Sequence, residues 1–558
     1  MNTKINIQTI MWSLLSTILF GICIYEYFTL SYNLQSIYDE GFFFITSCKL
    51  NDPIAFTQPL SLSVNLINAL IPNIDQYDIL SLRQDAFIAK GISLLVLFTC
   101  SCIYLYKRYN ERHLYAYLTM LSSYLLIATI LLPSIVFNMN DLMLILTSFA
   151  FSLCLIYSIT EKKVIQYFEV VLIGVVSCFT LLCNLPAGCM MIVLCLIYLG
   201  IYKNFNIRQV NYILVFGILG IIIGFLITHI WVISLQDCLE FMQKGITQTT
   251  TGGRASHHSL SKIILVIFLG LRDLTITVLI LCGLTYICKI IHNKVKKDWL
   301  TIISILILFL IVYKWQVKPQ ITITSIMCWL TILFLDNQFK NRKLKVDEIL
   351  LIVFSLVLPI GMVFGTNTSI IVKALLCSGS WGFLIFYLYY LTNSSKIWYA
   401  LVGYIIVICS VLNKIDFCDK SEDVFQFSSE KSIARMNLTK HQKKFYDEVY
   451  DVITEKGFVS NTDTMLGFCF NEMTIVAMNA VPYTNDQQPE EFLLHDLNIL
   501  PSPKFMILSE WDSVVLYSRL VELNWNFPDS YDYYKCRNNP DPNSKYDMTQ
   551  SIIYCRKD

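Results

Sequence analysis

Long apolar stretches separated by short polar connectors dominate the first three quarters of the chain. A helix that crosses a bilayer needs roughly 20 apolar residues, and about thirteen stretches approach this length. They are predicted near residues 9–30, 86–106, 114–136, 141–160, 165–184, 187–202, 210–233, 270–291, 299–313, 319–335, 348–365, 370–392 and 398–413. The pattern predicts a polytopic α-helical membrane protein.

The connectors between these stretches alternate in charge. "YKRYNER", "TEKK", "YKNFNIRQ", "HNKVKKD" and "KNRKLKVDE" are basic, whereas "FNMND", "NLPAG" and "GTNTS" carry no Lys or Arg. Because Lys and Arg concentrate in cytoplasmic loops, we expect the basic connectors to face the cytoplasm. The first apolar stretch has no small-residue cleavage site, so it is predicted to be a retained anchor in the plasma membrane.

The remaining segments are then expected on the extracytoplasmic side. They are a first loop at 31–85, a second at 234–262, the connector "YKWQVKP" and everything after about residue 413. Residues 1–413 thus form a membrane domain, and 414–558 form a soluble extracytoplasmic domain. Its pattern predicts one helix over "LTKHQKKFYDEVYDVITEKG" and strands at "TIVAMNA", "KFMILSE", "SVVLYSRL" and "SIIYCRK", which indicates an α/β or α+β fold. Cys536 and Cys555 can form a disulfide if this domain is outside the cell.

Composition supports a membrane protein and narrows its partners. The 558 residues are 55% hydrophobic and only 15% charged, which excludes an ordinary soluble domain. The formal net charge of +1 gives no electrostatic reason to expect nucleic acid as a partner. Membrane lipids are the expected surroundings.

The first outer loop opens with two adjacent carboxylates, Asp39 and Glu40, in "SIYDEGFFFITSCKLNDPIAFTQP". On a helix, neighbouring side chains point about 100° apart, so the two cannot act together on one target. A structural role as a helix N-terminal cap is the alternative. The prolines that follow suit short helices lying in the membrane interface, and Arg83 precedes the second span.

This arrangement of Asp39–Glu40, the step Gln58–Pro59 and Arg83 resembles the GT-C membrane glycosyltransferases. It is most similar to the lipid A aminoarabinose transferases and the protein O-mannosyltransferases, which use polyprenyl-phosphate sugars. The residue-level resemblance covers about 31–90, while the plan of many spans, a large first outer loop and a C-terminal outer domain covers the whole chain. Gln58 departs from the pattern, because the lipid A enzymes tend to have Lys before this proline.

The resemblance implies a transfer of sugar from a polyprenyl phosphate to a lipid, glycan or protein acceptor. It gives Asp39 the role of general base, Glu40 that of its support or of a ligand to a divalent metal, and Arg83 and Gln58 places near the donor phosphate. The departing phosphate needs positive charge. Other outer-facing residues that can supply it are Arg254, beside His257 and His258, Lys318, beside Lys314, and Lys373. A mobile loop, interfacial anchoring and snorkelling are the structural alternatives for these residues.

Two other functions remain open from the sequence. A polysaccharide polymerase or ligase is also polytopic, but it is expected to concentrate Arg and His in a late loop. A transporter or flippase uses ionisable groups at mid-membrane or broken helices. Lys90, Arg272, Asp273 and Lys373 are predicted to lie toward span ends, which favours the glycosyltransferase.

Overall fold

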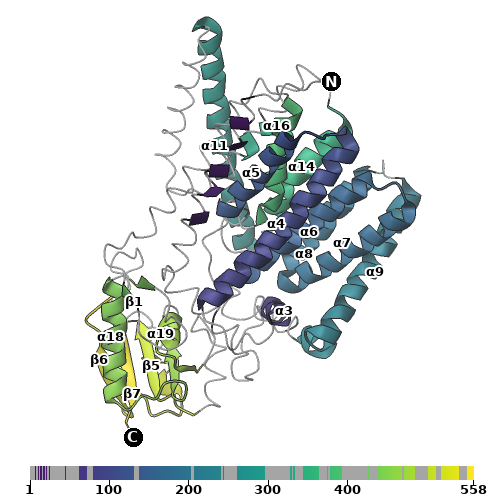
Figure 1. Cartoon of the computed structure of the whole chain (residues 1–558). Helices are drawn as coiled ribbons and strands as arrows, with labels where there is room; N and C mark the ends of the chain where they lie inside the picture. Colours follow the sequence, from purple (N-terminus) through teal and green to yellow (C-terminus); the bar gives the residue numbers. More distant parts are fainter. Residues whose placement is uncertain are drawn as a thin grey trace.

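The structure is a computed structural model of an apolar helical bundle with a separate C-terminal α/β region (Figure 1). It describes scattered positions between 7 and 44, then 62–71, 79–130, 137–202, 206–240, 243, 260–295, 327–329, 331–332, 344–362, 374, 377–392, 425–426, 437–438, 440–467, 471–483, 501–509, 517–518, 520–539 and 550–557. Within these residues, six helices are long and apolar enough to cross a membrane. The chain is therefore a membrane-embedded helical protein. Several of the roughly thirteen predicted spans lie outside the described residues, so that number stays a prediction.

The bundle is built from long helices, several of which pack most closely against helices that are not their neighbours in the chain. They are α4 (Ile79–Tyr109), α5 (Leu114–Ile130), α6 (Met139–Ile159), α7 (Lys163–Cys183), α8 (Leu185–Tyr202), α9 (Ile207–Trp231), α11 (Leu260–Val295), α14 (Val346–Gly361) and α16 (Gly379–Thr392). Helix α6 is the most enclosed of the six candidate spans, because 72% of its apolar window is buried inside the bundle. It lies between α4 and α7, with α8, α14 and α16 also in contact (Figure 1).

Most described helices coincide with the predicted spans, but two begin much earlier. Helix α4 starts at Ile79, so the predicted outer loop is helical at Arg83, and α11 starts at Leu260. Lys90 and the Arg272–Asp273 pair consequently lie farther from the helix starts than predicted. Polar residues in the first turns of α4 explain the late predicted start of that helix. In α11 residues 263–269 are apolar, so the predicted span simply began too late.

Helices α7 and α9 approach closely because glycines line their contact. A Cβ atom on Gly174 or Gly220 would meet the backbone of the facing helix, each within 2.9 Å of the other glycine's Cα. A Cβ on Gly224 would lie 2.6 Å from Cβ of Cys178. In lipid, no hydrophobic driving force brings two apolar helices together. Small residues at the contact let the backbones approach closely, so the helices gain dispersion contacts instead.

The described residues of the C-terminal region form a mixed five-stranded sheet, the helices α18 and α19 and a short helical segment at 517–518 and 520–522. Its elements are α18 (Lys440–Glu455), β3 (Thr464–Gly467), α19 (Glu472–Ala477), β4 (Val481–Pro482), β5 (Phe505–Ser509), β6 (Tyr531–Lys535) and β7 (Ser551–Arg556). The strand order is β4-β3-β5-β7-β6, in which β3 is parallel to β4 and β5, while β7 is antiparallel to β5 and β6. A short antiparallel pair, β1 (Phe425–Gln426) and β2 (Asn437–Leu438), precedes α18.

The expected α18, β5 and β7 are confirmed, whereas two predicted strands are wrong. The segment "TIVAMNA" forms much of α19, and the described residues of "SVVLYSRL" are helical. Both are short apolar runs with β-branched residues, for which periodicity cannot separate a strand from a buried helix. Tertiary context decides: Ile475 of α19 packs against the end of β3, where a Cβ added at Gly467 would lie 3.2 Å from Cδ1 of Ile475.

The predicted disulfide between Cys536 and Cys555 is also wrong, because both thiols are free and buried. Cys555 lies opposite Asp532 in the β6–β7 ladder, while the backbone of Cys536 bonds to Ser551. The two cysteines are thus about four residues apart along the ladder, roughly 13 Å, and too distant for a disulfide.

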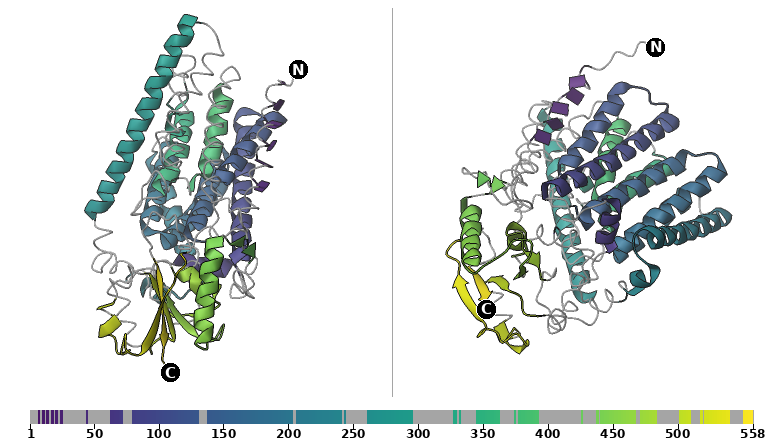
Figure 2. Two further views of the ribbon diagram at one scale, coloured as in Figure 1. Left: turned by 90° about the vertical axis from the view of Figure 1, so that its left-hand side faces the viewer. Right: turned by 60° about the horizontal axis from the view of Figure 1, so that its bottom comes forward.

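The C-terminal sheet has a defined direction relative to the bundle. The chain terminus, which directly follows β7, points away from the bundle in Figure 1 and in the left view of Figure 2. The start of β7 therefore lies toward the bundle. Since β5 is antiparallel to β7 and parallel to β3, the carboxyl ends of β3 and β5 also face the bundle.

Candidate functional site at the start of helix α4

Arg83 is the one predicted site residue that lies within the described part of the chain. The other predicted site residues, which are Asp39, Glu40, Gln58, Arg254, Lys318 and Lys373, lie outside it. Their roles stay predictions.

Arg83 lies in the second turn of α4 and is only 1% exposed. The opposite end of α4 carries Lys107 and Arg108, so Arg83 is at the end of the bundle away from this basic connector. A guanidinium is always charged, and burying one in a membrane protein is costly. Such residues usually face the bundle interior and mark a substrate or ion site.

Lys90 lies two turns beyond Arg83 on the same face of α4, because seven residues return a helix to nearly the same side. Its Nζ donates to Oδ1 of Asp141 on α6 at 2.7 Å, and the two side chains are 6% and 13% exposed. The other carboxylate oxygen of Asp141 accepts from the backbone N–H of Asn138 at 3.2 Å. Asn138 in turn accepts from the backbone N–H of Asn140 at 2.8 Å. Asp141 therefore both caps α6 and fixes it to α4.

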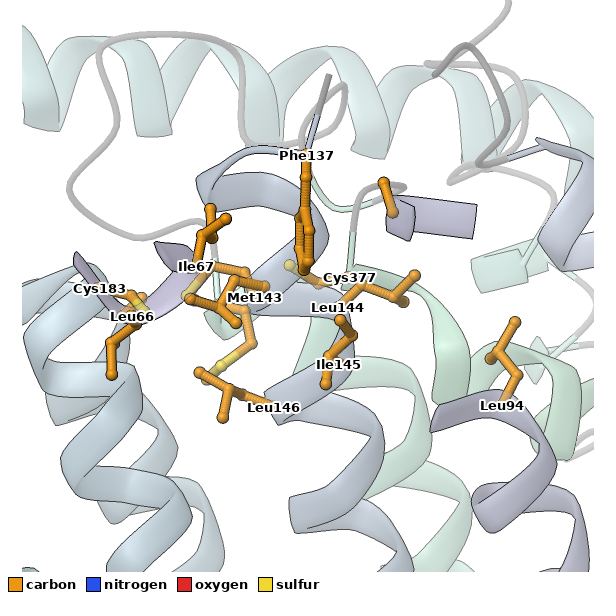
Figure 3. Packing of buried hydrophobic residues seen from close by; sticks show 14 of the residues in the cluster. Leu66, Ile67, Leu94, Phe137, Met143, Leu144, Ile145, Leu146, Cys183 and Cys377 are labelled. Atoms are coloured by element: carbon orange, nitrogen blue, oxygen red, sulfur yellow. The ribbon is translucent and has the colours of Figure 1, made fainter. Parts of the chain in front are cut away.

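Helix α3 (Leu62–Leu70) covers the beginning of α6. Figure 3 shows Leu66 and Ile67 of α3 beside Met143 of α6 and Cys183 of α7, and all four belong to one buried cluster. The expected short helix between the first two predicted spans is thus present, whereas its position at the outer membrane interface stays a prediction.

Two acceptor oxygens near this end of the chain's bundle are buried without a hydrogen-bond partner in the described structure. They are Oδ1 of Asn65 on α3 and Oδ2 of Asp85 on α4. Buried acceptors are normally paired, so these two oxygens are exceptions in the described part of the chain. Within the described residues, no group of three His, Cys, Asp or Glu is arranged to hold a metal.

The sequence analysis did not foresee the Lys90–Asp141 pair. A signal was nevertheless present, because the two residues have opposite charge and lie near the beginnings of two predicted spans. Charges inside spans tend to pair with one another. What the sequence lacked was the adjacency of α4 and α6, since α5 separates them in the chain.

The opposite end of the bundle holds a second polar network. Arg108 pairs with Asp347 at the start of α14, Tyr109 donates to Glu348 at 3.3 Å, and Tyr109 and Tyr387 share a hydrogen bond of 2.6 Å. These contacts bring together the end of α4 and the start of α14, which are next to two of the basic connectors. The predicted alternation of connectors agrees with this grouping.

Comparisons of the chain with family models, with curated proteins and with solved structures found no match. The resemblance to GT-C glycosyltransferases thus depends on the residues between 31 and 90. Function must be argued from the site itself.

Proposed function

We propose that the chain transfers a sugar from a polyprenyl-phosphate donor to an acceptor at the outer face of the plasma membrane. The observation that carries the proposal is the burial of Arg83 at the end of α4 that lies opposite Lys107 and Arg108. Under the positive-inside rule this is the extracytoplasmic end. The proposal has the donor phosphate bind beside this cation.

The proposed sugar transfer needs a cation for the leaving phosphate and a base for the acceptor hydroxyl. The bond between the anomeric carbon and the phosphate oxygen breaks through an oxocarbenium-like state, as in glycoside hydrolysis. The leaving phosphate keeps the bonding electrons, and Arg83 stabilises its charge with up to two parallel hydrogen bonds. Asp39 takes the proton of the acceptor hydroxyl as that oxygen bonds to the anomeric carbon, and Glu40 orients Asp39 or holds a metal.

The Lys90–Asp141 pair has a supporting role in this proposal. Lys90 lies on the Arg83 face of α4, and its 2.7 Å bond to Asp141 holds that face against the capped start of α6. Asp141 balances the charge of Lys90, so the pair adds rigidity without adding net charge. A fixed guanidinium loses less entropy when the phosphate binds.

The test separates donor binding from transfer. In lipid nanodiscs, Arg83→Gln is expected to weaken binding of undecaprenyl phosphate by about 10- to 100-fold, the range for a lost charged hydrogen bond. Arg83→Lys should recover part of the binding. Arg272→Gln is the matched control, because Arg272 is 52% exposed on α11 and pairs with its neighbour Asp273.

Asp39→Asn is expected to leave undecaprenyl phosphate binding intact and to reduce transfer by about 10²- to 10⁴-fold, the usual contribution of a general base. Full transfer by this variant would remove Asp39 from the mechanism. Equal donor binding by wild type and Arg83→Gln would remove Arg83.

Lipid-linked sugar transport is the second candidate, and the Lys90–Asp141 pair favours it. Lys90 lies eleven residues beyond Ile79, about 16 Å along the helix axis, and paired charges inside spans are typical of transport pathways. Movement of a labelled lipid-linked sugar across proteoliposomes without a covalent product would support transport. Its absence, together with a transferred product, would support the enzyme.

A further inference from the structure

The two ends of the C-terminal sheet differ in their polar chemistry. At the amino ends of the parallel strands, charged groups are paired: Lys504 donates to Asp463 at 2.8 Å and to the carbonyl of Gly457 at 2.9 Å. Arg556 at the end of β7 donates to the carbonyl of Ser502 at 2.9 Å. This end of the sheet is satisfied by its own residues.

The segment that follows β3, formed by Asn471 and the helix α19, carries uncharged polar groups that are not satisfied. Asn471 is 3% exposed and Thr474 is fully buried. Nδ2 of Asn471 and Oγ1 of Thr474 have no hydrogen-bond partner in the described part of the chain. Buried polar atoms of this kind usually have one.

Asn471 is also unusual for its position. It precedes α19, where an Asn side chain commonly accepts from the first backbone N–H groups, yet it makes no capping bond. Its Oδ1 instead accepts from Oγ of Ser551 at 3.3 Å. Ser551 is half-buried and pairs with Ser509 at the end of β5. The side chain of Asn471 is thereby directed across the ends of β3 and β5.

The strand order places these groups where α/β sheets bind ligands. The chain leaving β3 passes through α19 to β4 on one side, whereas β5 is followed by β6 and β7 on the other. The connections therefore diverge between β3 and β5, and the crevice at such a switch point is the usual ligand site. This edge faces the membrane bundle, as the direction of β7 shows in Figures 1 and 2.

We propose that Asn471, Thr474 and Ser551 form a binding site for an uncharged, hydroxyl-rich ligand, namely a carbohydrate. An amide N–H, an unpaired hydroxyl and a serine hydroxyl match sugar hydroxyls, which both donate and accept. An anionic ligand such as a phospholipid headgroup would call for a cation, and none is among these three. Peptides commonly bind by adding a strand at an exposed sheet edge, whereas β3 and β5 are interior strands.

The inference deepens the proposed function, on which it rests for the role of the bound sugar. The acceptor of the transfer would be a glycan, held by the C-terminal domain on the side that faces the start of α4.

The experiment uses the full-length protein in lipid nanodiscs, free of glycosidic detergents, on a panel of immobilised neutral oligosaccharides, sialylated oligosaccharides and peptides. Wild type is expected to bind neutral oligosaccharides. Thr474→Val, which keeps the shape and removes the hydroxyl, should weaken this binding about tenfold without lowering the unfolding temperature, because no hydrogen bond is lost in the free protein. Asn471→Asp, which replaces the amide donor by an acceptor, should abolish it.

Ser502→Ala is the matched control at the opposite end of the sheet, and it should bind as wild type does. Binding only to sialylated oligosaccharides or only to peptides, no binding at all, or equal binding by wild type and Thr474→Val would each overturn the site. The proposed transfer activity is measured separately through Asp39, so a failed glycan test leaves that proposal standing, and the reverse also holds.

Discussion

Replacing Gly220 by Ala tests the packing that holds α7 against α9. The added Cβ would lie 2.9 Å from Cα of Gly174 and closer still to the carbonyl oxygen of Val171, whereas ordinary contacts begin at 3.4 Å. The helices must therefore separate by at least about 0.5 Å, the difference between these two distances. A gap of that size already forfeits about a quarter of each dispersion contact along the crossing.

Gly217→Ala is the matched control on the same helix. A Cβ at Gly217 meets only Cγ1 of Val170, at 4.0 Å, and needs no movement. Both substitutions gain the same helix propensity, about 1 kcal/mol over Gly, so this gain cancels in the comparison. The difference that remains is the overpacking cost, about 1–3 kcal/mol.

The assay is thermal unfolding of the full-length protein, followed with a thiol-reactive dye. Cys178 and Cys183 on α7 are buried, so they react when α7 and α9 part. Gly220→Ala is expected to unfold several degrees below Gly217→Ala. Equal unfolding temperatures would refute the close approach of these two helices.

Two further predictions follow from the described contacts. Lys90→Met should destabilise the bundle by about 3–5 kcal/mol, because it leaves the Asp141 carboxylate buried without its partner. In a double-mutant cycle, adding Asp141→Asn should recover part of this loss. Additive losses would contradict the pairing. In the C-terminal domain, burial raises the pKa of Cys536 to about 12 and that of Cys555 to about 11. Both thiols should therefore resist maleimide at pH 8 in the folded protein and react with it after unfolding without a reductant. A need for reductant would indicate a disulfide.

The sequence indicated where to look for the site but not how it is built. It identified Arg83 as a cation beside the second span, and the structure places this residue in the second turn of α4, buried. The partnership of Lys90 with Asp141 could not be foreseen, because it depends on α4 packing against α6 across an intervening helix.

The C-terminal domain shows the same division. Its strands β5 and β7 follow from local composition and alternation, whereas the helix α19 was predicted to be a strand. The orphaned atoms of Asn471 and Thr474 become visible only when the sheet order and burial are known.

By itself, the sequence determined that the chain is helical and membrane-embedded, roughly where its described helices lie, and that its C-terminal part contains strands. These properties depend on runs of apolar residues and on the charge of short connectors, and both are local. The tertiary structure decided which charges pair, which glycines permit close approach and which end of the C-terminal sheet faces the bundle. Each of these depends on residues far apart in the chain, whose proximity no local pattern encodes.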